Sequence, residues 1–346
     1  MLPRVLILYT GGTFGMEAGL SLPRLSPSAS LDSLRSRLQA RVPELSQLAT
    51  CDIDIVLNLD SAHVGPDEWL LLARRVQQNW QRCDGVVILH GTDTLAYAAS
   101  ALSFLLRPCR KPVVLTGAQR PLSSLRTDAR RNLISAVDIA AHGPRPLVGQ
   151  VSIFFDDVLL QGNRARKRSA SEFAAFESPQ AAPLAVVGTS IRYARPPPKR
   201  GRAPALAPVF NRKVAMLHVT PGFPARAIER GLLPGLEGLV LIVFPSVTAP
   251  THDPAFLDLL RAARRRDLPV VIATESASHA GAAERDGGGA GPASYAAGRA
   301  LLEEGCLWAG PMTPECAYVK AQLLLGQGPG RAAFARRWKR DYAGEA

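Results

Sequence analysis

The chain has 346 residues, of which 47% are hydrophobic, and a formal net charge of +12 at pH 7. This length exceeds what one hydrophobic core usually serves, so we expect two globular domains. The longest apolar runs, such as 239–244, fall far short of the roughly 20 residues that a membrane-spanning helix requires, so no membrane partner is predicted. No basic start leads into an apolar segment with a cleavage site, which predicts a cytoplasmic protein.

Metal sites and nucleic-acid binding are not indicated by the sequence. The five cysteines lack C-x-x-C spacing, and the six histidines are scattered, so we predict reduced thiols, no metal and no cofactor. The basic runs are short and are not interleaved with aromatic residues, which favours a solvated surface and predicts no nucleic-acid partner.

Short apolar runs rich in β-branched residues alternate with helix-like segments in the first half of the chain. This alternation predicts a large N-terminal α/β domain with a mainly parallel sheet, over residues 1–190. The expected strands are 5–9, 53–57, 86–89, 113–116 and 151–155.

A second α/β series begins after a proline-rich segment. Consecutive prolines exclude helix, and the neighbouring charges favour water, so 194–202 indicates a linker that we place over 191–212. A smaller C-terminal α/β domain over 213–346 follows. Its expected strands are 214–219, 239–244 and 270–274, and a helix is expected over 254–266.

In parallel sheets, ligands bind outside the carboxyl ends of the strands, and the first expected strand is followed there by Thr-Gly-Gly-Thr-Phe-Gly-Met at 10–16. The glycines permit close backbone approach to a ligand, and Thr13 offers a hydroxyl group. A phosphate-binding loop is the competing interpretation. The segment has neither the lysine nor the glycine spacing that such a loop requires.

Polar residues also follow the next three expected strands. They are Asn-Leu-Asp-Ser-Ala-His at 58–63, His-Gly-Thr-Asp-Thr-Leu at 90–95, and Leu-Thr-Gly-Ala-Gln-Arg-Pro at 115–121. The first two segments fit an ordinary turn or a helix N-cap as well as a substrate site. The third, with Arg-Thr-Asp-Ala-Arg-Arg-Asn-Leu at 126–133, has no definite role from chemistry alone.

Taken together, these segments resemble the bacterial-type L-asparaginase family, in particular its type I cytoplasmic members. The matching motifs are TGGTFGM, DSAHVGPDEW, LHGTDTLAYAASAL, and LTGAQRPL with TDARRNL, in the family's order and spacing. The likeness is strong over roughly the first half of the chain and weaker in the second domain. It implies an asparaginase/glutaminase-like fold and a homodimer or homotetramer.

The resemblance implies that Thr13 attacks the side-chain carboxamide of L-asparagine. Ammonia would leave, and water would hydrolyse the acyl-enzyme to L-aspartate. The family's second catalytic group corresponds to Thr92, Asp93 and Lys167, which would tune the threonine hydroxyl and orient the water. Ser61 would hold the substrate's α-carboxylate and Asp93 its α-ammonium group. The implied substrate pocket also includes Gly12, Ala62, Thr92 and Ala118.

Three departures from the family pattern leave the exact activity open. The family's mobile-segment tyrosine is missing, because no tyrosine lies between Tyr9 and Tyr97. The family's G-N-A-P segment reads V-T-A-P at 247–250, and His63 replaces a common acidic residue. The alternatives are therefore a working asparaginase, a hydrolase of a related amide such as glutamine, or a catalytically weak binding protein. A transfer-RNA amidotransferase subunit is a more distant alternative.

Overall fold

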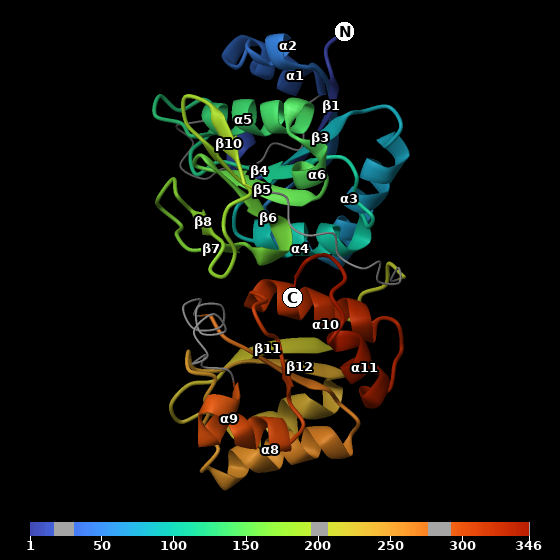
Figure 1. The fold of residues 1–346 in the computed structure, drawn as a ribbon, viewed down its shortest axis with the longest axis vertical. Coiled ribbons are helices and arrows are strands. Elements are labelled where there is room, and N and C mark those ends of the chain that lie inside the picture. The colour runs from blue at the N-terminus through green and yellow to red at the C-terminus, as the bar shows by residue number, and fades with distance from the viewer. Residues whose placement is uncertain (17–30, 195–206, 276–291, 346) are drawn as a thin grey trace. The chain divides into compact units, whose positions relative to one another are not determined.

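A computed structural model describes residues 1–16, 31–194, 207–275 and 292–345 of the chain (Figure 1). The chain divides into two compact units, residues 1–200 and 201–346. The predicted linker of 191–212 stays a prediction: 195–206 lie outside the described residues, and 191–193 form a strand of the first unit. No helix in the described ranges has the length and apolar character needed to cross a membrane.

The first unit contains an eight-stranded sheet whose order is β10-β9-β6-β5-β4-β3-β1-β2. Strands β1 to β5 run parallel, which confirms the predicted mainly parallel sheet. The strands are β1 (Arg4–Gly11), β2 (Thr50–Leu59), β3 (Gly85–Leu89), β4 (Val113–Thr116), β5 (Val151–Phe155), β6 (Val158–Gln161), β9 (Ala185–Val187) and β10 (Ile191–Tyr193).

Helices cover both faces of this sheet, so its central strands are buried on both sides. Strands β3, β4 and β5 are therefore continuous apolar runs rather than alternating ones. Helix α5 lies on one side of the sheet and α4 on the other (Figure 1). The helices are α1 (Leu31–Arg41), α2 (Leu45–Leu48), α3 (Pro66–Asn79), α4 (Leu95–Leu105), α5 (Ala129–His142) and α6 (Arg145–Val148).

The antiparallel edge of the sheet was not predicted from the sequence. Strand β5 reverses into β6 through a tight turn at Asp156 and Asp157, whose φ angles are 44° and 68°. Strands β9 and β10 continue this antiparallel edge. A separate two-stranded hairpin joins β7 (Arg166–Lys167) to β8 (Phe176–Glu177) and places Lys167 on a strand.

The second unit is a smaller α/β domain with a four-stranded parallel sheet in the order β11-β12-β13-β14. This confirms the predicted fold class, and helix α8 spans nearly the predicted residues. The strands are β11 (Val214–His218), β12 (Gly238–Ile242), β13 (Val270–Ala273) and β14 (Leu307–Trp308). The helices are α7 (Ala225–Ala227), α8 (Pro254–Arg265), α9 (Ala296–Glu303), α10 (Pro314–Leu325) and α11 (Arg331–Trp338).

Candidate active site

Glycines bring together the loops that follow the four parallel strands β1 to β4. Gly12 has a φ of +77°, and a Cβ atom on it would lie 2.6 Å from Gly91 Cα. A Cβ atom on Gly91 would in turn lie 2.7 Å from Ser61 Cβ, and one on Gly117 would lie 2.4 Å from His90 O. Any side chain at these positions would force the loops apart. These glycines therefore permit close contact between loops of the protein itself, whereas the predicted close approach of the 10–16 backbone to a ligand stays a prediction.

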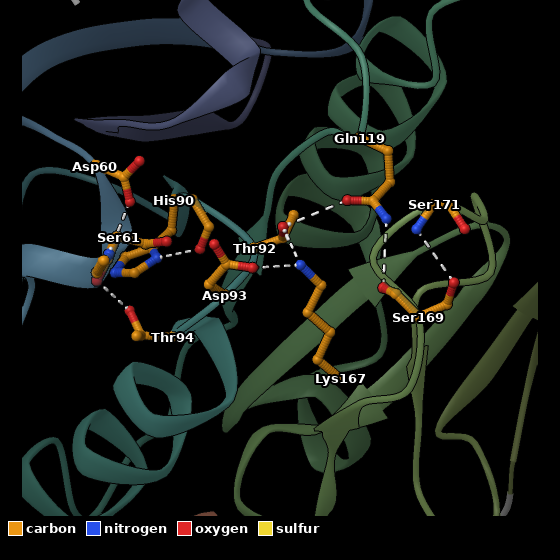
Figure 2. A network of polar contacts seen from close by, with 12 residues as sticks. Asp60, Ser61, His90, Thr92, Asp93, Thr94, Gln119, Lys167, Ser169 and Ser171 are labelled. Atoms are coloured by element: carbon orange, nitrogen blue, oxygen red, sulfur yellow. Dashed lines mark hydrogen bonds and ion pairs between the residues drawn. The ribbon is translucent and has the colours of Figure 1, made fainter.

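The side chain of Lys167 contacts two of the predicted catalytic residues (Figure 2). Its Nζ donates hydrogen bonds to Thr92 Oγ1 at 2.8 Å and to Asp93 Oδ1 at 2.6 Å. Thr92 is buried, whereas the Asp93 side chain is 68% exposed and the Lys167 side chain only 17% exposed. The lysine thus approaches from the protein side, and the carboxylate faces the open side of the site.

Gln119 extends this group of contacts. Thr92 Oγ1 donates to Gln119 Oε1 at 3.4 Å, and Gln119 Nε2 donates to the backbone oxygens of Glu172 and Ser169 at 3.0 and 3.4 Å. The amide is therefore oriented with its oxygen toward Thr92 (Figure 2). Because Lys167 donates to Thr92, the threonine proton points toward Gln119.

A buried carboxylate holds the loop that carries Gln119. Asp128, just before α5, accepts hydrogen bonds from the backbone N–H groups of Gln119 at 2.9 Å and Arg120 at 3.0 Å. Asn132, one turn further along α5, donates through Nδ2 to Gly117 O at 3.0 Å and accepts through Oδ1 from Asp156 N at 3.3 Å. Helix α5 therefore ties the loop after β4 to the turn between β5 and β6.

Ser61 is buried at the start of the short 3₁₀ helix η2 (Ser61–His63), which follows β2. Thr94 occupies the N-cap position of α4, but its hydroxyl donates to Ser61 O at 2.6 Å instead of capping the helix. Asp60 Oδ1 accepts from Ala62 N at 2.9 Å. The segment 90–95, for which a helix N-cap was one of two interpretations, therefore uses the Thr94 hydroxyl to join two loops. Asp60 fixes the turn that presents Ser61.

The remaining predicted site residues lie around this group. Thr13 is half-buried and begins the 3₁₀ helix η1 (Thr13–Gly15), directly after Gly12. Among the described residues, no hydrogen bond or ion pair joins its side chain to Thr92, Asp93 or Lys167. Gly12 thus brings the Thr13 turn to this edge of the sheet through backbone contact alone. Ala118 is buried beside Gly117, whereas Ala62 is exposed.

His90 directly follows β3, and its side chain is buried. Its Nδ1 lies 2.7 Å from Gly91 O and donates to it, while Nε2 is buried and has no hydrogen-bond partner among the described residues. Burial lowers the pKa of His90 from its ordinary value of 6.5, because the protonated imidazole would be a charge removed from water.

We expect this histidine to contribute to loss of stability at acidic pH. Below pH 6.5 the unfolded chain takes up a proton at His90 that the folded protein resists, so the free energy of unfolding falls as pH decreases. In His90→Gln, the free energy of unfolding in urea should decrease less between pH 7 and pH 5 than it does in the wild type. The control is His252→Gln at an exposed position, and an unchanged slope in His90→Gln would contradict the assignment.

The departures from the family pattern differ in where they lie. The segment that lacks the tyrosine, 17–23, is outside the described residues. His63 is exposed on η2. Val247 has a φ of 56°, in a tight turn where its N–H donates to Phe244 O at 2.8 Å. A branched residue is strained in this conformation, which favours glycine.

Two family models match the chain: "Asparaginase, N-terminal" over residues 4–199 and "Glutaminase/Asparaginase C-terminal domain" over residues 213–337. L-asparaginase 1 of Escherichia coli is 34% identical over 93% of this chain and 92% of its own length. The human 60 kDa lysophospholipase is 35% identical over 96% of this chain, which spans only 59% of that protein.

A solved structure supports the same relationship. The crystal structure of L-asparaginase I from Vibrio cholerae has a TM-score of 0.82 and 31% identity, with coverage of 100% of this chain and 99% of that one. Similarity in sequence and in structure therefore extends over both units. From these matches we conclude that the chain belongs to the bacterial-type asparaginase family.

Proposed function

We propose that this protein is a cytoplasmic L-asparaginase that converts L-asparagine to L-aspartate and ammonia through an acyl-enzyme on Thr13. The observation that carries the proposal is the group formed by Lys167, Thr92 and Asp93, at the edge of the sheet where Gly12 presents the Thr13 turn. Family membership supports the amide chemistry.

In the proposed reaction, Thr13 Oγ attacks the side-chain carboxamide carbon, and the carbon–nitrogen bond breaks to release ammonia. Backbone N–H groups near Thr13 and Thr92 stabilise the oxyanion. Water then attacks the ester, oriented by Thr92 and Asp93, and Lys167 adjusts their protonation. In the first step the proton of the Thr13 hydroxyl passes to the leaving nitrogen and departs with ammonia. In the second step the attacking water supplies a proton to Thr13 Oγ as the ester bond breaks, so L-aspartate is released and the enzyme is regenerated.

We propose that two side chains orient the substrate, one through its negative charge and the other through its hydroxyl group. The exposed Asp93 carboxylate binds the α-ammonium group of the amino acid, and the buried Ser61 hydroxyl binds its α-carboxylate. The pocket is completed by Gly12, Ala62 and Ala118. The reaction uses no metal or cofactor, and we propose that the active form is a homodimer or homotetramer.

Ammonia release by the purified protein tests the proposal, with L-asparagine, L-glutamine and the tRNA-linked amides compared under the same conditions. We expect release from asparagine to exceed release from the others. Faster ammonia release from glutamine or from a tRNA-linked amide would show that asparagine is not the preferred substrate. If the folded protein releases no ammonia from any of them, a binding role is favoured. A parallel assay with lysophosphatidylcholine, motivated by the human relative, measures fatty-acid release, which we expect to be absent.

A further inference from the structure

A cavity of about 250 Å³ lies behind the turn that carries Thr13. Its walls come from that turn, from helix α1 and from the loop after β4. The lining residues with polar side chains are Arg37, Arg41 and Ser123. The cavity is distinct from the contacts of Lys167, because neither Lys167 nor its partners line it.

Three successive backbone oxygens of the Thr13 turn are bonded to this wall. Phe14 O accepts from Leu122 N at 3.2 Å, and Gly15 O accepts from Arg37 Nη1 at 3.2 Å. Met16 O accepts from the hydroxyl of Ser123 at 3.4 Å. Anything that moves Arg37 or Ser123 therefore acts on the turn of the proposed nucleophile.

The cavity has an excess of positive charge. Arg37 and Arg41 are four residues apart on α1, so both guanidinium groups project from one face of the helix, where like charges destabilise it. In the described part of the chain, neither arginine forms an ion pair with a carboxylate, and Arg37 Nε is buried without a hydrogen-bond partner. A guanidinium group in such surroundings favours a bound anion.

We propose that this cavity binds a small dianion, a phosphate or a dicarboxylate, between Arg37 and Arg41, and that binding stiffens the Thr13 turn. The dianion would supply acceptors for the free guanidinium N–H groups, including Arg37 Nε, and would offset the repulsion between the two charges. Because Arg37 also donates to Gly15 O, a fixed guanidinium group restricts the turn.

Calorimetric titration of the full chain with inorganic phosphate, and separately with succinate, tests the binding. We expect one saturable site for at least one anion, with affinity reduced about tenfold or more in Arg37→Gln and in Arg41→Gln. Arg41 is exposed, so its variant keeps the fold. Arg35→Gln is the matched control, because Arg35 lies on the same helix but does not line the cavity. The anion affinity of this variant should equal that of the wild type.

No saturable binding of either anion, or an equal loss of affinity in Arg35→Gln, would overturn the site. Comparison of phosphate with succinate distinguishes a phosphate ligand from a dicarboxylate ligand, because the class that the cavity prefers should bind more tightly. The variant Lys167→Met removes the amine of the proposed catalytic group and should bind the anion with unchanged affinity. A reduced affinity in this variant would place the anion in the proposed active site instead of the cavity.

The effect on the turn is measured by hydrogen exchange without any substrate. The amide of Gly15 donates to Gly12 O at 3.3 Å and that of Met16 to Thr13 O at 3.1 Å, so both report on the turn. Saturating anion should slow their exchange in the wild type but not in Arg41→Gln. Binding with unchanged exchange would overturn the coupling. Any effect on turnover rests on the proposed function, whereas these two measurements do not.

Discussion

Thr13→Ala is expected to lower the turnover number for amide hydrolysis by about 10⁴-fold or more, because it removes the proposed nucleophile. Thr92→Val should have a comparable effect: it keeps the shape of the side chain but removes the hydroxyl that accepts from Lys167 and donates to Gln119. Both variants should give the circular dichroism spectrum of the wild type. The measurement is ammonia release at saturating substrate.

Thr13→Ser is the matched control for the nucleophile, since it keeps a hydroxyl at the same place and removes only a methyl group. We expect it to retain much more activity than Thr13→Ala. Wild-type turnover in both Thr13→Ala and Thr92→Val would exclude the proposed mechanism, even if the protein proved to be an asparaginase.

Glu345→Gln is expected to destabilise the second unit by about 3–5 kcal/mol, because it leaves a buried charge without its partner. Lys320 on α10 and Glu345 are both fully buried, and their Nζ and Oε1 atoms lie 2.7 Å apart. The lysine also donates to Arg340 O at 2.9 Å and lies over the rings of Trp338 and Tyr342.

The measurement is the free energy of unfolding in urea. Lys320→Met combined with Glu345→Gln should be less destabilising than Glu345→Gln alone, since an apolar side chain carries no charge to bury. The matched control is the exposed pair of Lys213 and Glu237, which lie 2.9 Å apart, where Glu237→Gln should change stability little. Equal effects of the two glutamine substitutions would contradict the role assigned to Glu345.

The parallel strands could be predicted from the sequence because a strand buried on both faces is a continuous apolar run. Strands β3, β4 and β5 were predicted to within one residue at each end for this reason. Strands β9 and β10 have only three residues each, and only Ala185 among them is buried, so they lack such a run. The pairing of β6 with β5 depends on a turn at two aspartates, which is not a usual hairpin sequence.

The candidate site could be predicted only in part, because its contacts join residues far apart in the chain. Lys167 lies 75 residues from Thr92, and only the family resemblance connected them before the structure. Asp128 and Gln119 were visible as part of the segments at 126–133 and 115–121, but no local pattern indicates that one holds the other. Both positions are recognisable only once α5 and the loop after β4 are placed together.

The last residue of the proposed catalytic group, Lys167, lies on the hairpin that follows the antiparallel strand β6. This position determines the order in which the site is completed during synthesis. A nascent chain that has left the ribosome only through β5 already contains Thr13, Ser61, Thr92 and Asp93, and the parallel strands that hold them. The amine that contacts Thr92 and Asp93 emerges later, on β7. A growing chain therefore acquires the parallel sheet before it acquires all members of the proposed catalytic group. If that group is catalytic, translation products that end before residue 167 should be inactive however well they fold.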